Sequence, residues 1–340
     1  MSTTTASVLQ RRSVNLVAQP AETAGDLAQR LLAGLGRDDS LARVLACGPA
    51  AQAAQARAVL GPEVPVTWLA NERLSGLQGF VIDGPVERVY DDGRCVGVTY
   101  DDALGRWCLL GNLWLDDPTL DPDAIVHGTF VRVESVLAEL GLSILDTVRT
   151  WLYVDRILDC YGELNAARRR YFRERGVFDH LVPASTGIGV PNAEGARLVM
   201  DVLAWQRPAG RVVPSPSPLQ GSALDYGSAF SRGVELDLGD HRELLVSGTA
   251  SIDPDGRTLH DDPADQVDLT MAVVEGILTA SCYTWAQVSR AVVYAPEDAD
   301  EAAARAWFKA HDLLELPGLW VRSDICRGDL RYEIEVDATA

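Results

Sequence analysis

The second half of the chain repeats residues of the first half at a fixed distance, and this repeat constrains the fold more than any other feature. Several pairs of equal residues share an offset of 141 positions: Glu134 and Glu275, Arg149 and Arg290, and Tyr153 and Tyr294. Each copy has the predicted order strand, helix, strand, helix, strand, strand. We therefore predict an α+β fold made of duplicated units, with helices packed on one face of each mixed β-sheet.

Hydrophobic periodicity and turn residues place the elements of both copies. Helices are predicted over residues 126–140, 161–175, 263–281 and 297–314, and strands over 148–154, 197–205, 243–252, 289–295, 319–326 and 330–337. Residues 207–219 contain four prolines, which favours a semi-rigid connector without regular structure. We therefore divide the chain into an N-terminal domain, residues 1–222, which includes a degenerate copy, and a C-terminal domain, residues 223–340.

Composition excludes several classes of partner and chemistry. The chain has 49 acidic and 30 basic side chains and a formal net charge of −19, which argues against nucleic acids and anionic membranes as partners. No apolar run is long enough to span a bilayer and no signal peptide is recognisable, so we expect a cytoplasmic protein. The six cysteines lack metal-ligand spacing, so we expect reduced thiols and no metal. Lys309 is the single lysine, which argues against Schiff-base and phosphate-loop chemistry.

The two copies differ at two charged positions near the end of the repeat. The last two strands are aligned separately, because the segment between them is four residues longer in the first copy. This alignment places Ala184 opposite Arg322, and Val199 opposite Glu333. A purely structural role would tolerate many residue types in both copies. We interpret the joint loss of the two charges as the filling of one site with core residues, while the other site is kept.

The final predicted strand has three acids on one face. Glu333, Glu335 and Asp337 alternate with apolar residues, so all three point to the same side of a strand. One interpretation is a face exposed to solvent. The other is a carboxyl group in a cleft that acts as a general acid or base, next to an arginine of the adjacent strand. Arg322 and Cys326 lie four positions apart and are predicted to share a face of that adjacent strand.

Three segments together resemble a known family. They are YGSAFSRG at 226–233, LLVSGTASID at 244–253 and VRSDICRGDLRYEIE at 321–335. The combination is similar to the RidA (YjgF) family, over residues 223–340 and, as a degenerate copy, over 107–206. With its long N-terminal region and its duplicated unit, the chain resembles more closely the chorismatases. These enzymes cleave chorismate to pyruvate and a ring carboxylate.

The resemblance implies roles for individual residues. Glu333 matches the catalytic carboxyl group, which protonates the methylene carbon of the enolpyruvyl side chain. Arg322 matches the arginine that binds a substrate carboxylate, and Tyr226 and Arg232 match further substrate contacts. Chorismate is a dianion, for which arginines are suitable ligands, and the cleavage needs no metal and no organic cofactor.

The resemblance also bears on the product. Gly248 and Cys326 match the positions that differ between the hydrolytic and the aromatising branches of the family. We expect the aromatising branch, which forms 3-hydroxybenzoate through an arene-oxide-like intermediate. The hydrolytic branch, which yields a dihydroxycyclohexadiene carboxylate, is the alternative.

Two other classes of function fit some of the same residues. One is an enamine or imine deaminase of RidA type, which also uses an arginine and a glutamate. The other is a ligand-binding protein without catalysis, against which the retention of Glu333 in one copy argues. RidA proteins are trimers with sites between subunits, so the resemblance implies either a monomer or a RidA-like trimeric arrangement.

Overall fold

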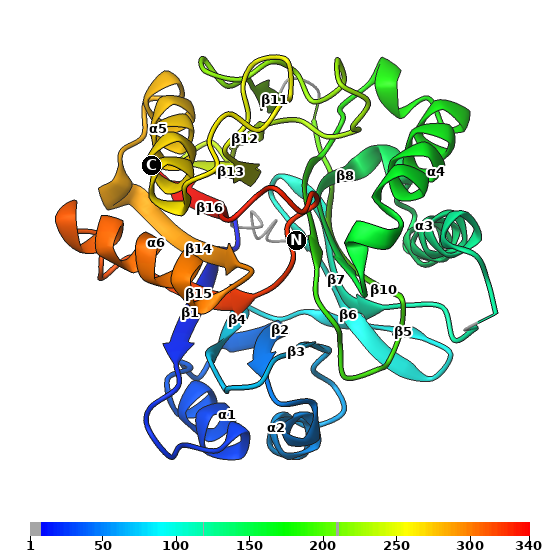
Figure 1. The fold of residues 1–340 in the computed structure, drawn as a ribbon. Coiled ribbons are helices and arrows are strands. Elements are labelled where there is room, and N and C mark those ends of the chain that lie inside the picture. Colours follow the sequence, from blue (N-terminus) through cyan, green and yellow to red (C-terminus); the bar gives the residue numbers. More distant parts are fainter. Residues whose placement is uncertain (1–7, 118, 209–210) are drawn as a thin grey trace.

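The computed structural model describes residues 8–117, 119–208 and 211–340, which form three β-sheets arranged around a common centre (Figure 1). A pair of helices covers the outer side of each sheet: α1 with α2, α3 with α4, and α5 with α6. The inner faces of the three sheets contribute to one shared hydrophobic cluster. All three units therefore pack against one another at the centre of the molecule.

The middle unit and the last unit have the same topology. The middle unit contains β5 (Glu87–Asp91), β6 (Arg94–Asp102), β7 (Gly105–Leu113), α3 (Pro122–Glu139), β8 (Thr147–Val154), α4 (Tyr161–Glu174), β9 (Ala184–Gly189) and β10 (Leu198–Gln206). The last unit contains β11 (Val212–Ser215), β12 (Gly233–Asp237), β13 (Arg242–Ala250), α5 (Pro263–Ala280), β14 (Val288–Ala295), α6 (Asp298–Ala310), β15 (Gly318–Arg322) and β16 (Glu333–Thr339).

The strand orders of these two sheets confirm the predicted duplication. They are β5-β6-β7-β10-β8-β9 and β11-β12-β13-β16-β14-β15, which become identical when each strand is matched to the one six labels later. In each sheet the last pair, β8 with β9 or β14 with β15, is parallel and the other neighbours are antiparallel. The sheets are therefore mixed, as predicted.

The N-terminal region forms a third and shorter unit, to which the sequence analysis assigned no role. It contains β1 (Arg11–Val17), α1 (Ala24–Ala33), β2 (Asp39–Gly48), α2 (Ala53–Leu60), β3 (Val66–Ala70) and β4 (Gly76–Asp83). Its strand order, β1-β4-β2-β3, matches the last four strands of the other two sheets. The first unit thus lacks only the initial pair of strands.

The long helices of the two full units begin in the same way. Asp121 and Asp262 are the N-cap residues of α3 and α5, and each is followed by a proline in the first turn. Each carboxylate accepts a hydrogen bond from a backbone N–H of that turn, which would otherwise have no partner. Proline suits the first turn because its missing N–H is not needed there.

Two predicted elements differ from the structure. The proline-rich connector contains strand β11, in which Pro214 pairs with Val234; an edge strand tolerates proline because only one of its sides is paired. The strand predicted over 319–326 ends at Arg322, so Cys326 lies in the loop before β16. Arg322 and Cys326 therefore do not share a strand face. The domain boundary after residue 222 stays a prediction.

Three buried arginines occupy equivalent positions in the three units. Arg43 on β2, Arg149 on β8 and Arg290 on β14 are all fully buried. Each lies near the common centre, where its strand begins to pair with its parallel neighbour. Arg149 pairs with the first residue of that neighbour, and Arg43 and Arg290 each lie one residue before the residue that does so. The repeat in the sequence had already paired Arg149 with Arg290, and the structure adds Arg43.

Each of these arginines contacts a polar residue of another unit. Arg149 donates to Glu335 over 2.8 Å, Arg290 donates to Gln78 over 3.0 Å, and Arg43 forms an ion pair with Asp201. Gln78, Asp201 and Glu335 are themselves equivalent, because each lies two residues before the strand partner of its own unit's arginine. A closed ring of polar contacts therefore joins the three units at the centre.

Candidate active site

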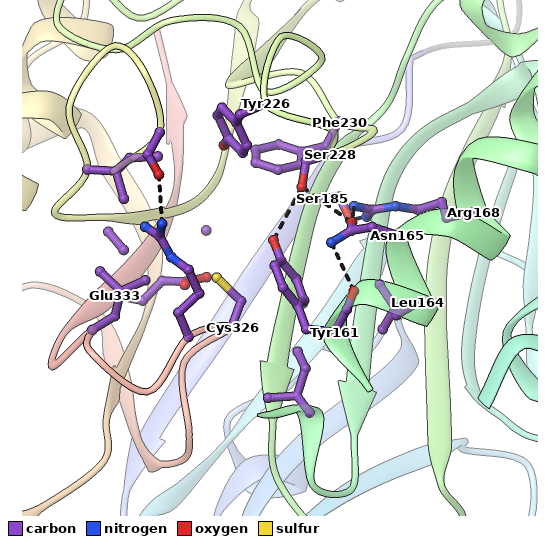
Figure 2. A pocket seen from close by; sticks show the side chains of 18 of the residues that line it. Tyr161, Leu164, Asn165, Arg168, Ser185, Tyr226, Ser228, Phe230, Cys326 and Glu333 are labelled. Atoms are coloured by element: carbon purple, nitrogen blue, oxygen red, sulfur yellow. Dashed lines mark hydrogen bonds between the residues drawn. The ribbon is translucent and has the colours of Figure 1, made fainter. Parts of the chain in front are cut away.

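A pocket with a cavity volume of about 200 Å³ lies between the middle unit and the last unit. Helix α4 and strand β9 contribute to one wall, and β13 with the loops before β12 and β16 contributes to the other (Figure 2). The predicted site residues that line it are Tyr226, Arg232, Gly248, Cys326 and Glu333. The structure thus brings together every predicted site residue except Arg322.

Arg322 lies elsewhere, at the boundary between the last unit and the first unit. Its guanidinium group is 3.4 Å from Asp298 and 3.7 Å from Glu72, and its Nε donates to the carbonyl oxygen of Pro296 over 3.1 Å. The end of β15 therefore directs this side chain away from the pocket. Other arginines have to bind any carboxylate in the pocket.

The strand registers also test the comparison between the two copies. Tyr153 pairs with Val199 and Tyr294 pairs with Glu333, so Val199 is the counterpart of Glu333, as the sequence analysis proposed. The counterpart of Arg322 is Gly189 and not Ala184, because Val154 and Ala295 face these two positions. The sequence alignment of β9 with β15 is therefore displaced by five residues from the alignment that the structure gives.

Glu333 is the first residue of β16 and is 5% exposed. Burial raises the pKa of its carboxyl group to about 8, and the negative charge of Glu335 acts in the same direction. The positive charges of Arg232 and Arg149 offset part of this rise. Glu333 is therefore mostly protonated at pH 7, as a general acid needs to be.

Gly248 on β13 makes room for that carboxyl group. A Cβ atom at this position would overlap Oε1 of Glu333 and would lie 3.0 Å from Cγ2 of Thr186. The backbone N–H of Gly248 donates to Oγ1 of Thr186 over 3.0 Å, which fixes the strand against β9. The sequence analysis related Gly248 to the choice between the two product branches, and in the structure its missing side chain leaves space for the acid.

Cys326 lies in the loop between β15 and β16, next to the acid. Burial raises the pKa of its thiol to about 12, and the charge of Glu333 contributes in the same direction. The side chain is therefore a neutral thiol at ordinary pH and not a thiolate. Any role of Cys326 is that of a weak hydrogen-bond donor or a small packing residue, since the thiolate is the nucleophilic form.

Arg232 and Tyr226 come from the segment before β12. Nε of Arg232 donates to the carbonyl oxygen of Gly221 over 3.1 Å, while its buried NH2 group has no partner among the described residues. Its guanidinium group lies 5.4 Å from the ring centroid of Tyr226 and 5.5 Å from that of Phe230. A buried guanidinium with a free N–H is suited to bind a carboxylate.

The sequence analysis missed several polar residues of the opposite wall. Arg168 of α4 donates to Asn165 over 2.8 Å and to the hydroxyl of Ser185 over 3.3 Å, and its buried Nε has no partner in the described chain. The hydroxyls of Tyr161 and Ser228 lie 3.3 Å apart (Figure 2). These groups add a second buried guanidinium to the pocket.

A signal for Arg168 was present in the sequence. The residue lies four positions after Leu164 and four before Phe172, both of which are buried on the inner face of α4. An arginine in the middle of an apolar helix face is rarely buried without a functional or structural partner. The same burial lowers the pKa of the Arg168 guanidinium, whose attraction by the Tyr161 hydroxyl acts in the opposite direction.

The described residues contain neither a cluster of metal ligands nor a helix that could span a membrane. Within residues 8–117, 119–208 and 211–340, no group of three or more His, Cys, Asp or Glu side chains is placed to hold a metal ion. Across the same residues, every helix is too short or too polar to cross a membrane.

Comparisons with known proteins were made by sequence and by structure. No protein-family model matches the sequence, and no curated protein matches it. A solved chorismatase structure superposes with a TM-score of 0.71 at 18% identity, over 98% of this chain and 99% of that one. Shorter solved structures also match, among them the Escherichia coli YjgF gene product (TM-score 0.30, 20% identity, 37% of this chain and 97% of that one) and E. coli TdcF with bound serine (TM-score 0.31, 19% identity, 38% and 98%). The chain therefore has the fold of a chorismatase over almost its entire length.

Proposed function

We propose that this protein is a chorismatase that converts chorismate to pyruvate and 3-hydroxybenzoate. The observation that carries the proposal is the carboxyl group of Glu333, which is buried in a pocket that also holds two guanidinium groups with free N–H groups. The fold shared with a solved chorismatase supports the same conclusion. A buried neutral acid is suited to protonate carbon, and buried arginines are suited to hold a dianion.

The first step is proton transfer from Glu333 to the methylene carbon of the enolpyruvyl group. The enol ether becomes an oxocarbenium ion, and the carboxylate that remains stabilises the positive charge next to it. Arg168 and Arg232 bind the two carboxylates of the substrate, one on each wall of the pocket. A substrate held by both arginines in this pocket presents its methylene carbon to Glu333, which lines the same pocket.

The second step releases pyruvate and keeps the oxygen of the 4-hydroxyl group on the ring. The 4-hydroxyl oxygen of the substrate attacks C3 while the bond from C3 to the ether oxygen breaks, so the ether oxygen becomes the keto oxygen of pyruvate. The hydroxyl proton returns to Glu333, which restores the acid. The C4–O bond of the resulting arene oxide breaks and the hydrogen on C3 moves to C4, which leaves a ketone at C3. One C4 hydrogen then leaves as a proton and the C3 oxygen takes up a proton, which gives 3-hydroxybenzoate without uptake of water. The neutral thiol of Cys326 is a hydrogen-bond donor to the epoxide oxygen.

Incubation of the protein with chorismate in water enriched in oxygen-18 tests this proposal. We expect release of pyruvate, measured by lactate dehydrogenase, and 3-hydroxybenzoate without label in its ring hydroxyl, measured by mass spectrometry. A non-aromatic diol as the main product would assign the protein to hydrolysis, because water then adds to the oxocarbenium carbon and both ring oxygens come from chorismate. Absence of pyruvate at any pH between 5 and 8 would contradict chorismatase activity altogether. Cys326→Ala separates the role of the thiol, since unchanged rate and product would leave it as a packing residue.

Replacement of Gly248 by alanine is expected to reduce the rate of pyruvate release without unfolding the protein. The added Cβ occupies the place of Oε1 of Glu333, and the carboxyl group has to turn away from the substrate. Misplacement of a reacting group by about 1 Å costs on the order of 100-fold in rate. A matched control is Gly187→Ala on β9, which also lines the pocket but where an added Cβ meets nothing within 4 Å. Equal losses in both variants would contradict this role of Gly248.

A further inference from the structure

Two glutamates on the same face of β16 have opposite environments. The carboxyl group of Glu333 forms no hydrogen bond with any described residue, and the charged side chains near it act on it only through their electrostatic field. Glu335 is fully buried and accepts hydrogen bonds from Arg149 (2.8 Å), Arg290 (2.5 Å) and the indole of Trp151 (3.0 Å). Although burial opposes ionisation, the two arginines lower the pKa of Glu335 to about 2. Glu335 is therefore an anion at neutral pH.

The surroundings of Glu335 are also joined to those of Glu333. The hydroxyl of Thr186 on β9 donates to Glu335 and accepts the N–H of Gly248, the residue that makes room for the acid. Arg149 donates to Thr186 over 3.1 Å and to the carbonyl oxygen of Val246 over 2.7 Å. The ion pair at the centre of the molecule thus extends, through one threonine, to the wall of the pocket.

The same arrangement recurs between the first unit and the middle unit, without the acid. There Arg43 pairs with Asp201, and Asp201 accepts hydrogen bonds from the hydroxyl of Thr67 (2.7 Å) and from the N–H of Asn112 (2.7 Å). By strand register these residues are the counterparts of Arg149, Glu335, Thr186 and Gly248. At the place of Glu333 this copy has Val199. The ring of polar contacts made by these arginines is therefore common to the fold, and only one of its members has an acid beside it.

The groups that face Glu333 explain why the nearby ion pair matters to it. Glu335 on its own strand raises the pKa of Glu333, and Arg149 from β8 and Arg232 from the segment before β12 lower it. The neutral Cys326 thiol and the buried Tyr294 hydroxyl also interact with it, and Arg168 and Arg327 line the same pocket. While Glu335 is present, its carboxylate is the hydrogen-bonded partner of Arg149. Without it, Arg149 would lose this partner, and its positive charge would act more strongly on Glu333 and on Asp337.

We propose that Glu335 is a positioning residue whose fixed negative charge engages Arg149 and thereby keeps the neighbouring Glu333 carboxyl in its neutral, proton-bearing form. The inference rests on the proposed function only in the use that the reaction makes of that proton. It assigns to one member of the central ring a task that the other members do not have. Removing the charge of Glu335, and not merely its packing, should then ionise Glu333 at neutral pH.

Titration of the Glu333 carboxyl group tests this inference without any substrate. Protein labelled with carbon-13 at the glutamate δ-carbon gives a signal that is assigned by its loss in Glu333→Gln, and the pH is varied from 5 to 9. For the natural protein we expect a midpoint near pH 8. In Glu335→Gln the midpoint should fall by about one to three pH units, the effect of replacing a like charge by an unopposed opposite one. In Glu335→Asp, which keeps the charge, it should stay above pH 7.

Asp201→Asn is the matched control, because it removes the counterpart anion from the copy that has no acid. It should leave the Glu333 midpoint unchanged. An unchanged midpoint in Glu335→Gln, an equal fall in Glu335→Asp, or a midpoint below pH 6 in the natural protein would each overturn the inference. If Glu335→Gln fails to fold, a midpoint below pH 7 in Glu335→Asp or below pH 6 in the natural protein still overturns the inference. The expected titration without pyruvate release from chorismate would contradict the proposed function and leave this inference standing, whereas pyruvate release with an unaltered midpoint in Glu335→Gln would do the reverse.

Discussion

Glu333→Gln is expected to lose pyruvate release by a factor of about 10²–10⁴ while remaining folded. Glutamine has nearly the same shape as glutamic acid, so it fills the space beside Gly248, but its amide cannot deliver a proton to carbon. Substrate binding by Arg168 and Arg232 is preserved, so the loss should fall on kcat and leave KM nearly unchanged. Steady-state kinetics with chorismate, together with circular dichroism, measure both effects.

The stability of the same variant provides an independent check of the buried acid. Burial raises the pKa of Glu333 to about 8, whereas a glutamate in an unfolded chain titrates near pH 4.3. Between these two values the folded protein binds one more proton than the unfolded chain, so the free energy of unfolding falls as the pH rises. Glu333→Gln lacks this loss and should be more stable than the natural protein at pH 8, with the difference disappearing below about pH 4. A difference in stability that does not vary with pH would contradict a neutral Glu333.

Glu333 could be found from the sequence because the relevant information lies within one strand. Alternation over residues 333–337 sets the face, and the offset of 141 relates Tyr153 to Tyr294. The strand registers then pair these tyrosines with Val199 and Glu333. The duplication was recognisable for the same reason, since helix starts, turns and strands keep their residue types. These features depend on local chemistry that both copies need.

Arg322 was assigned wrongly to the neighbourhood of Glu333 because its place depends on contacts that lie far apart in the sequence. The end of β15 and its register against β14 decide where the side chain points, and residues of the first unit receive it. The first unit itself was missed because it shares strand order but few residue types with the other two; Arg43 is one of the few. Arg168 was missed because its pocket exists only once the last unit packs against α4. Alternation and offsets contain no information on such packing between units.

Arg290→Met is expected to lower the free energy of unfolding by about 3–5 kcal/mol, the largest effect on stability that we predict. Arg290 is fully buried and contacts Glu335 over 2.5 Å, Asp337 over 3.1 Å and Gln78 over 3.0 Å. Methionine fills most of the volume but leaves the anion of Glu335 with one arginine instead of two. Urea denaturation at pH 7 measures the change.

The matched control is Arg305→Met on α6, which removes an arginine from an exposed pair. Arg305 lies 2.7 Å from Glu301 one helical turn away, and its side chain is 49% exposed. Water solvates both charges there, so the loss should stay below about 1 kcal/mol. Similar losses in the two variants would mean that the central ring contributes no more than a surface ion pair. A large loss confined to Arg290→Met would instead identify the ring as one contact that stabilises the first unit against the last one, since Arg290 is the member that bonds to Gln78 of β4.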